Sequence, residues 1–322
     1  SQRPQRELTV GLNPVEDRVP IGDYRGLQAD LIVGISPDTH QALWIGDRAT
    51  TQRSGKVQQL SAHIRTILPV SEQANAPILV EVCVESVAGA YAAVVGGADR
   101  IELCSSLAEG GLTPSAGLCE AVCAATQVPV FAMVRPRAGD FLYDSTEVDV
   151  MARDIEALQD AGAAGFVTGA LTSDGHIDHR RMAEFVDLAA GKPVTCHRAF
   201  DMCRDAAEGL ETLCDLGIPR VLTSGQKATA YDGRALIRSM VDQADGRIIV
   251  MAGCGIRDSN AERLVEVTGV SEVHLSAAGS RDSRMAFRRD GVAMGARGSD
   301  EYSLRTTEDS LIARVVAALR DR

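Results

Sequence analysis

Residues 78–104 read ILVEVCVESVAGAYAAVVGGADRIELC and decide the fold. Two short runs in this stretch, 78–84 and 100–104, are predicted strands because apolar and β-branched side chains favour strands. The segment between them, 86–97, is long enough for the crossover helix that two parallel strands require. The stretch is therefore a predicted βαβ unit, and a parallel sheet begins close to Pro77.

The same alternation of strand and helix continues toward the C-terminus. The predicted strands are 78–84, 100–104, 129–134, 165–169, 193–197, 220–223, 247–252 and 271–275. The predicted helices are 86–97, 115–126, 147–161, 178–190, 205–215, 230–242, 258–268 and 308–320. Eight such units fit the roughly 250 residues of a TIM barrel, and no Gly-rich dinucleotide fingerprint follows the first strand. We predict an α/β fold: a (β/α)8 TIM barrel over 77–322, with a small N-terminal extension over 1–76.

The composition indicates an ordinary globular protein and leaves the binding of small ligands open. Apolar residues make up 45% of the 322-residue chain, and the formal net charge is −11. Such a charge argues against nucleic acid or an anionic membrane as the main partner. All eight cysteines lie after Pro77, and no apolar run approaches the ~18 residues of a membrane span. Since the polar start also differs from a signal peptide, we expect a cytoplasmic protein with free thiols.

Polar side chains interrupt the apolar strands at alternate positions. Alternate residues of a strand point to one face, and the reactive face of a barrel lies at the C-terminal ends of its strands. The polar residues expected inside near that end are Glu81, Cys83, Glu102, Cys104, Arg135, Thr195, His197 and His274. Each alone also has a structural interpretation, since a buried glutamate can pair with an arginine and a strand cysteine can be a small core residue. Their convergence predicts a ligand site or active site at one barrel mouth.

Small residues follow the last three predicted strands. The candidates for binding an anion through backbone N–H groups are Ser224, Gly225, Gly253, Gly255 and Ser276. Barrels often hold a phosphate in the loops after their last two strands, although glycines there can also serve only as tight turns. Cys119 and Cys123 are four residues apart on a predicted helix, and we interpret them as packing residues.

Ordered strings of residues resemble the CutC family, which is named for copper homeostasis. The strings are EVC (81–83), GADRIELC (97–104), GGLTPS (110–115), RPRAGDF (135–141), CHRAFD (196–201), LTSGQ (222–226) and EVH (272–274). The resemblance covers 77–322 and implies a (β/α)8 barrel, a cytoplasmic location and Cu(I) binding through Cys83 and Cys104. The chain departs from the family in its long N-terminal extension, and at Cys196, where the family more often has an aromatic residue.

Two functions from different classes stay open. A copper-binding protein would hold Cu(I) between Cys83 and Cys104, because Cu(I) accepts two thiolates and neighbouring strands lie ~4.8 Å apart. His197 or His274 would supply a third donor. In either function we expect a homo-oligomer, a dimer.

The alternative is an enzyme of the lyase, aldolase or isomerase type that acts on a small phosphorylated or carboxylate substrate. The residues assigned to it are Glu81, Glu102, Arg135, Arg137, His197, Arg198, Asp201 and His274. The arginines would bind the anionic group of the substrate. The glutamates or His197 would transfer protons, and Asp201 would orient a neighbouring side chain.

Overall fold

The computed structural model describes residues 32–35, 42–45, 77–289, 291–292, 294 and 300–320. The chain divides into two units, Ser1–Arg53 and Ser54–Arg322. In the first unit, β1 (Ile32–Ile35) pairs antiparallel with β2 (Ala42–Ile45). The boundary between 76 and 77 stays a prediction, since residues 46–76 lie outside the described part.

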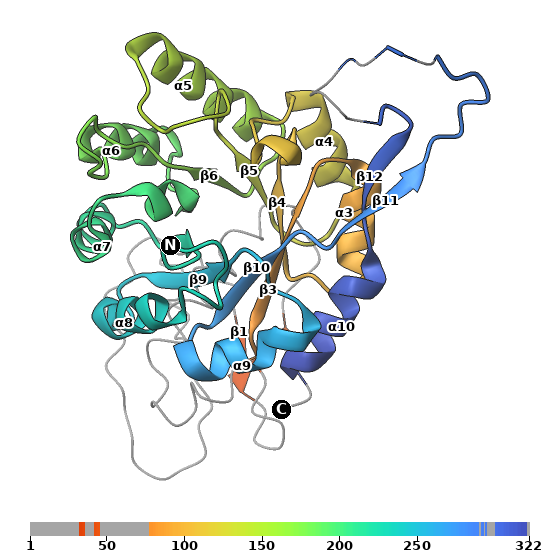
Figure 1. The fold of residues 1–322 in the computed structure, drawn as a ribbon. Coiled ribbons are helices and arrows are strands. Elements are labelled where there is room, and N and C mark those ends of the chain that lie inside the picture. The colour runs from red at the N-terminus through yellow and green to blue at the C-terminus, as the bar shows by residue number, and fades with distance from the viewer. Residues whose placement is uncertain are drawn as a thin grey trace, which may run out of the picture. The chain divides into compact units, whose positions relative to one another are not determined.

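The second unit contains a closed barrel of eight parallel strands (Figure 1). The strands are β3 (Leu79–Val84), β4 (Arg100–Leu103), β5 (Val130–Met133), β6 (Gly165–Thr168), β7 (Val194–Cys196), β8 (Arg220–Thr223), β9 (Ile249–Gly253) and β10 (Glu272–Leu275). They follow one another around the barrel in chain order, and β10 closes it against β3. The predicted (β/α)8 barrel and its eight strands are confirmed.

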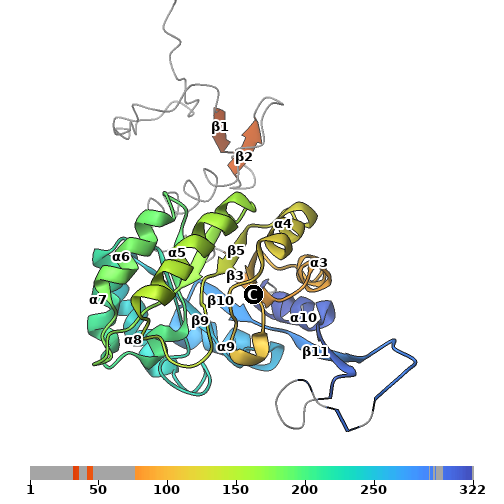
Figure 2. The same cartoon turned by 90° about the horizontal axis from the view of Figure 1, so that it is seen from above.

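A helix follows each strand or strand-end loop, and the helices succeed one another around the outside of the barrel (Figures 1 and 2). They are α3 (Val87–Val95), α4 (Ala116–Ala125), α5 (Ser145–Asp160), α6 (His179–Leu188), α7 (Ala206–Asp215), α8 (Arg234–Ala244), α9 (Asp258–Thr268) and α10 (Asp309–Arg320). Side-chain caps fix several starts. Ser86 accepts the Gly89 N–H, and Asp144 and Glu147 form a capping box that begins α5.

Two different cores result from the alternation along the strands. Between strands and helices the packing is apolar, with side chains such as Val80, Val82 and Ile101 fully buried. Inside the barrel the lower layer is charged. Arg100 pairs with Glu81 and Glu272, Arg220 pairs with Glu272, and both guanidinium groups lie over the Phe131 ring, 5.2 and 5.6 Å from its centroid. This ion network forms the floor beneath the barrel mouth.

After β10 the chain forms a hairpin that was not predicted. β11 (Ala278–Asp282) pairs antiparallel with β12 (Ser303–Thr307), and the hairpin extends away from the barrel before α10 begins (Figures 1 and 2). In the described part of the chain, no helix has the length and apolar character to cross a membrane.

Candidate functional site

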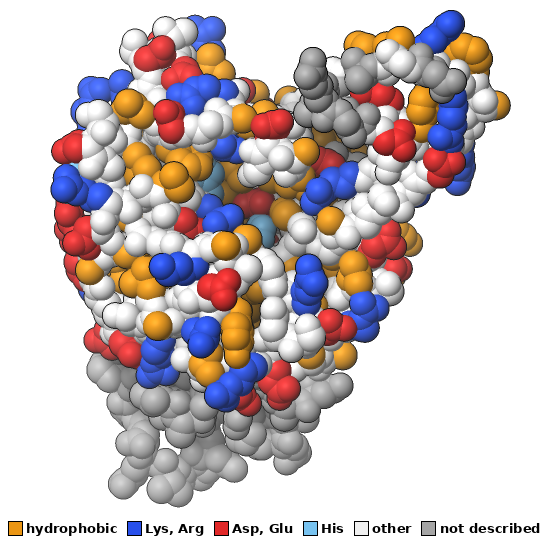
Figure 3. Space-filling view, viewed as in Figure 1, with side chains coloured by type: hydrophobic (Ala, Val, Ile, Leu, Met, Phe, Trp, Pro, Cys, Tyr) orange, Lys and Arg blue, Asp and Glu red, His pale blue; other side chains and the backbone are white. Residues whose placement is uncertain are grey.

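A cavity of about 870 Å³ opens at the C-terminal ends of the barrel strands. Figure 3 shows a hollow in this face, in which histidine, acidic and basic side chains gather. The charged residues and histidines that line the cavity are Glu102, Glu109, Arg135, His197, Arg198, Asp201, Arg257, Asp258, His274, Arg305 and Arg314. Several side chains that the sequence placed at the mouth therefore meet in one cavity.

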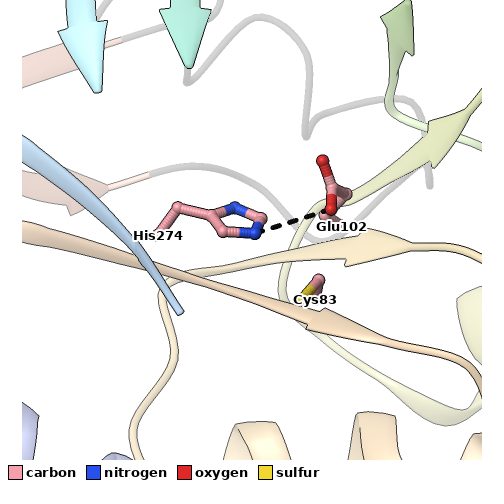
Figure 4. Close-up of side chains that lie close together, drawn as sticks. All are labelled: Cys83, Glu102 and His274. Atoms are coloured by element: carbon pink, nitrogen blue, oxygen red, sulfur yellow. Dashed lines mark ion pairs between the residues drawn. The ribbon is translucent and has the colours of Figure 1, made fainter. Parts of the chain in front are cut away.

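Cys83, Glu102 and His274 form the cluster of metal-ligating side chains at this mouth (Figure 4). They come from β3, β4 and β10, and one donor atom of each lies within 4.8 Å of the others. Strand register explains the meeting, because Cys83 stands opposite Glu102 on one side of β3 and His274 stands opposite Glu81 on the other. The Nε2 atom of His274 lies 3.6 Å from a Glu102 oxygen.

Glu81 lies below this cluster and fixes the orientation of His274. Its fully buried carboxylate lies 2.9 Å from His274 Nδ1 and also pairs with Arg100. Burial alone would lower the pKa of His274, but Glu102, Cys83 and Glu81 outweigh burial and raise that pKa well above its usual value. The pKa of Glu81 is held below its usual range, since Arg100 and His274 outweigh its burial. The geometry therefore places a proton on Nδ1 and turns Nε2 toward Glu102.

Cys104 lies deeper than Cys83 and does not line the cavity. It packs with Phe131, Met133 and Val167, and its thiol is 3.5 Å from a Glu102 oxygen. Burial and Glu102 raise the pKa of Cys104 well above the usual value. Cys83 and Cys104, which were predicted to bind one ion together, are not directly opposite each other, because Glu102 stands opposite Cys83.

Arg135 and His197 form a second polar group in the same cavity, with Phe141 in contact with both. The Arg135 guanidinium carbon is 5.1 Å from the Phe141 ring centroid, and the His197 ring centroid is 5.0 Å from it. His197 Nδ1 accepts the Ala199 N–H at 3.2 Å, so its proton lies on Nε2. Burial, and next the Arg135 charge, lower the pKa of His197 to about 3. His197 is therefore neutral at physiological pH.

The other two predicted arginines have different positions. Arg198 lines the cavity, donates to Asp201 at 2.7 Å and reaches Ser224 at 3.0 Å. Arg137 does not line it, because its guanidinium turns outward and binds Glu147 and Asp140. This differs from the expectation that Arg137 faces the mouth, and it assigns Arg137 to the loop before α5.

Asp201 joins two loops at the rim. Its carboxylate accepts hydrogen bonds from the Thr223 hydroxyl, the Ser224 hydroxyl and backbone, and the Gln226 backbone. These contacts hold the loop after β8, and the orienting role of Asp201 in a reaction stays a prediction. One of them engages the Ser224 N–H, which we had predicted to bind an anion.

The predicted anion-binding loops are split between the cavity and its surroundings. Gly255 and Ser276 line the cavity, whereas Ser224 and Gly225 do not. Gly253 belongs to β9, where a Cβ would lie 2.5 Å from Leu222 and 3.3 Å from His274. The absence of a side chain at Gly253 thus leaves room for His274.

Comparison with known proteins decides the family. The sequence pattern of the CutC family matches residues 78–279. This chain belongs to the CutC family. The copper homeostasis protein cutC homolog of Mus musculus is 52% identical over 244 residues, which cover 76% of this chain and 90% of that protein. The homolog of Homo sapiens is 52% identical over 231 residues, 71% of this chain and 85% of that protein.

A solved structure supports the fold of this CutC family member. The copper homeostasis protein CutC of Streptococcus agalactiae matches with a TM-score of 0.59 and 31% identity. The match covers 61% of this chain and 97% of that one. The family is thus shown by sequence, and the barrel by structure.

Sequence reasoning missed four residues that shape this CutC site: Arg100, Phe141, Arg220 and Glu272. Three of them lie inside the barrel, and two of these stand two positions before a predicted site residue of the same strand face, Arg100 before Glu102 and Glu272 before His274. The alternation along β4, β8 and β10 was the signal that could have found them. Phe141 follows a loop, where no such periodicity holds.

Proposed function

We propose that this CutC family member binds Cu(I) as its cargo at the barrel mouth, with Cys83 as the first ligand. The observation that carries the proposal is the cluster of Cys83, Glu102 and His274, whose donor atoms lie within 4.8 Å of one another. Relatives at 52% identity are named copper homeostasis proteins. Glu102 and His274 line the same cavity as Cys83, which gives an ion a path in.

The donor chemistry selects among the three side chains. Cu(I) is soft and prefers thiolate and imidazole to carboxylate. Cys83 and His274 Nε2 are therefore the preferred pair, and Glu81 on Nδ1 orients the imidazole as a carboxylate does in many metal sites. Cys104 stays in the proposal as a second thiolate, which requires its thiol to leave Glu102. Glu102 is a harder donor than Cys83 and His274, and its negative charge favours a bound cation beside them.

Anaerobic titration against a chromogenic Cu(I) chelator tests this proposal. The wild type should bind about one Cu(I) per chain, as coordination by few soft ligands requires. The Cys83→Ser and Cys104→Ser double variant should lose it. The matched control is Cys119→Ser with Cys123→Ser, two thiols that lie 4.0 Å apart on α4, away from the mouth. Stoichiometric copper in the first double variant would exclude its two cysteines as ligands.

A second candidate function is favoured by the size of the cavity. A volume of about 870 Å³ is in the range of small-molecule sites, roughly 300–1,000 Å³, and is far more than one ion needs. This favours an enzyme that acts on a small carboxylate or phosphorylated substrate, with Glu102 and His274 as the acid–base pair. The reaction type is the lyase, aldolase or isomerase class that the sequence suggested.

The proposal extends to the setting of the protein. All eight cysteines are free thiols, which fits a reducing cytoplasm. We place the chain there as a homodimer. Fractionation of cells and sedimentation of the full chain test these two points, and a monomer in sedimentation would contradict the second.

A further inference from the structure

We propose that Arg135, Phe141 and His197 form a binding site for the carboxylate group of a small molecule, separate from the Cys83–Glu102–His274 cluster. The three side chains lie on the β5 and β7 side of the cavity, and all three line it. The inference deepens the second candidate function, because it names the substrate class of that cavity. It does not depend on copper.

The first observation is the charge of Arg135. Three arginines of the described barrel are nearly buried, with exposed fractions of 2% for Arg100, 8% for Arg220 and 6% for Arg135. The first two pair with Glu81 or Glu272. Among the described residues no carboxylate lies within ion-pair distance of Arg135, whose Nη atoms instead donate to the carbonyl oxygens of Glu109, Gly111 and Gly139. A buried cation without an anion is costly, so Arg135 carries a charge that a bound anion would neutralise.

The usual structural explanation of a buried arginine does not apply here. Neither Glu81 nor Glu102 forms an ion pair with Arg135: Glu81 pairs with Arg100 and His274, and Glu102 Oε2 lies 3.6 Å from His274 while Glu102 Oε1 is buried without a hydrogen-bond partner. The three carbonyl oxygens hold the guanidinium plane in place without reducing its charge. Arg135 is therefore held by carbonyl dipoles and not by a counterion, which leaves its charge available to a bound anion.

The second observation is the donor on His197. Nδ1 is occupied by the Ala199 N–H, so Nε2 carries the proton, and this buried Nε2 has no hydrogen-bond partner. Arg135 Nε is likewise buried without a hydrogen-bond partner, as is the hydroxyl of Tyr143, which interacts with Arg135. Buried donors without partners are rare in folded proteins, and two on adjoining side chains of one cavity point to a ligand that accepts from both.

The local structure is built to hold His197 in this place. A Cβ on Gly169 would lie 2.6 Å from His197 Nδ1, so only glycine leaves the ring its position. Phe141 contacts both Arg135 and His197 and offers an apolar face for the carbon atoms of a ligand. Neutral His197 beside Arg135 also avoids a second buried positive charge.

The charge balance selects the ligand class. Five arginines and four carboxylates line the cavity, in a chain whose net charge is −11. Arg198 pairs with Asp201 and Arg314 with Asp258, which leaves Arg135 as the deep uncompensated cation. One monoanion neutralises it, whereas a phosphate dianion would leave a buried negative charge. A carboxylate is therefore favoured over a phosphate.

The test is a titration of the full chain with acetate, pyruvate and inorganic phosphate at constant ionic strength, read by NMR of the histidine ring nitrogens. The sequence has six histidines, so the His197 signal can be assigned with a His197→Gln variant. Both carboxylates should shift the His197 Nε2 signal to saturation. Arg135→Gln should weaken this binding tenfold or more, as loss of a charge-assisted contact does. A His197 signal that no anion moves overturns the proposal, and tighter binding of phosphate overturns the carboxylate class.

Matched controls separate this site from general electrostatics and from copper. Arg247→Gln removes the same charge from an exposed ion pair with Glu211 on the outside of the barrel, and should leave carboxylate affinity unchanged. Equal losses in Arg135→Gln and Arg247→Gln would reduce the effect to net charge and contradict the site. Cys83→Ser should keep carboxylate affinity, and Arg135→Gln should keep Cu(I) stoichiometry. A wild type that binds carboxylate but no copper would refute only the copper proposal. If Arg135→Gln does not fold, the wild-type His197 shift still decides.

Discussion

His197 is neutral because of where the chain places it, between a buried guanidinium and an aromatic ring. Burial disfavours its charged form, and Arg135 adds to the effect, which lowers its pKa to about 3. In the unfolded chain the same imidazole titrates near 6.5. The folded and unfolded states therefore bind different numbers of protons throughout mildly acidic solution.

This difference predicts a pH dependence of stability. Below pH 6.5 the unfolded chain takes up a proton at His197 and the native protein does not, so the contribution is full above pH 6.5 and declines as the pH falls toward 3. From pH 6.5 to pH 5 the wild type should lose about 2 kcal/mol of unfolding free energy relative to His197→Gln, at ~1.4 kcal/mol per pH unit. Urea unfolding of both proteins at several pH values measures the difference. If the unfolding free energies of the two proteins fell in parallel with pH, the pKa of His197 in the native state would not be lowered as described.

At the scale of the element, the residue that follows β6 determines where the side chain that follows β7 can lie. Gly169 follows β6 and is buried, and a Cβ there would lie 2.6 Å from His197 Nδ1 and 2.9 Å from the Ala199 Cβ. The glycine is needed for space, since its φ is not positive. The position of the His197 side chain, directly after β7, thus depends on the absence of a side chain at Gly169, directly after β6.

Gly169→Ala tests this dependence. Overpacking a well-packed site typically costs 1–3 kcal/mol, so we expect a loss of that order, about 1–3 kcal/mol, together with weaker carboxylate binding because His197 is displaced. Gly117→Ala is the control. Gly117 is exposed in α4 with nothing within 4 Å of the added Cβ, and the change should stabilise the protein by about 0.5–1 kcal/mol, as alanine does in a helix. Urea unfolding and the NMR titration measure both variants, and an unaltered His197 signal in Gly169→Ala would contradict the dependence.

The barrel elements were predictable because their signals are local. Short β-branched runs, helical spacing and caps such as Asp144 act within a few residues, and the alternation along a strand decides which side chains share a face. This is why Glu102, His197 and His274 were predicted inside and are found there. The β11–β12 hairpin was missed since its strands, AGSRD and SLRTT, are mostly exposed and lack an apolar face.

What could not be predicted depends on register and on the ends of strands. Cys83 and Cys104 were paired because the family resemblance implies it and because they lie on neighbouring strands, but the stagger between β3 and β4 puts Glu102 opposite Cys83. That stagger is a property of the closed barrel, not of either strand. Arg137 was assigned to the binding of an anionic substrate, but it lies in the loop after β5, which ends at Met133, so strand alternation does not determine its direction. The ion-pair partners depend likewise on side-chain conformations that no local pattern encodes.

At the scale of the whole molecule, the barrel is closed around charge. Arg100 on β4, Arg220 on β8 and Glu272 on β10 join strands from opposite sides of the barrel, and Arg220 donates to Glu272 at 2.6 Å. The pKa of Glu272 is lowered, since the two arginines outweigh its burial. Such a network stabilises only as a complete set, because each charge has given up its water. The mouth above it depends on the same set, since Glu81 links Arg100 to His274.

Removing one charge of this network should therefore lower the free energy of unfolding more than removing an arginine and its carboxylate together. Glu272→Gln leaves Arg220 without a carboxylate and should cost about 3–5 kcal/mol of unfolding free energy, the usual range for a broken buried pair. Adding Arg220→Met to it removes the orphaned charge, so the double variant should be more stable than Glu272→Gln alone, although it lacks one more native side chain. Exposed Glu211→Gln, which breaks the pair with Arg247, should leave the urea midpoint nearly unchanged. A double-mutant cycle from urea unfolding measures the coupling, and two additive losses would mean that the charges inside the barrel act independently. Coupling of the expected sign would instead mean that charge balance, more than shape, determines which substitutions this barrel tolerates.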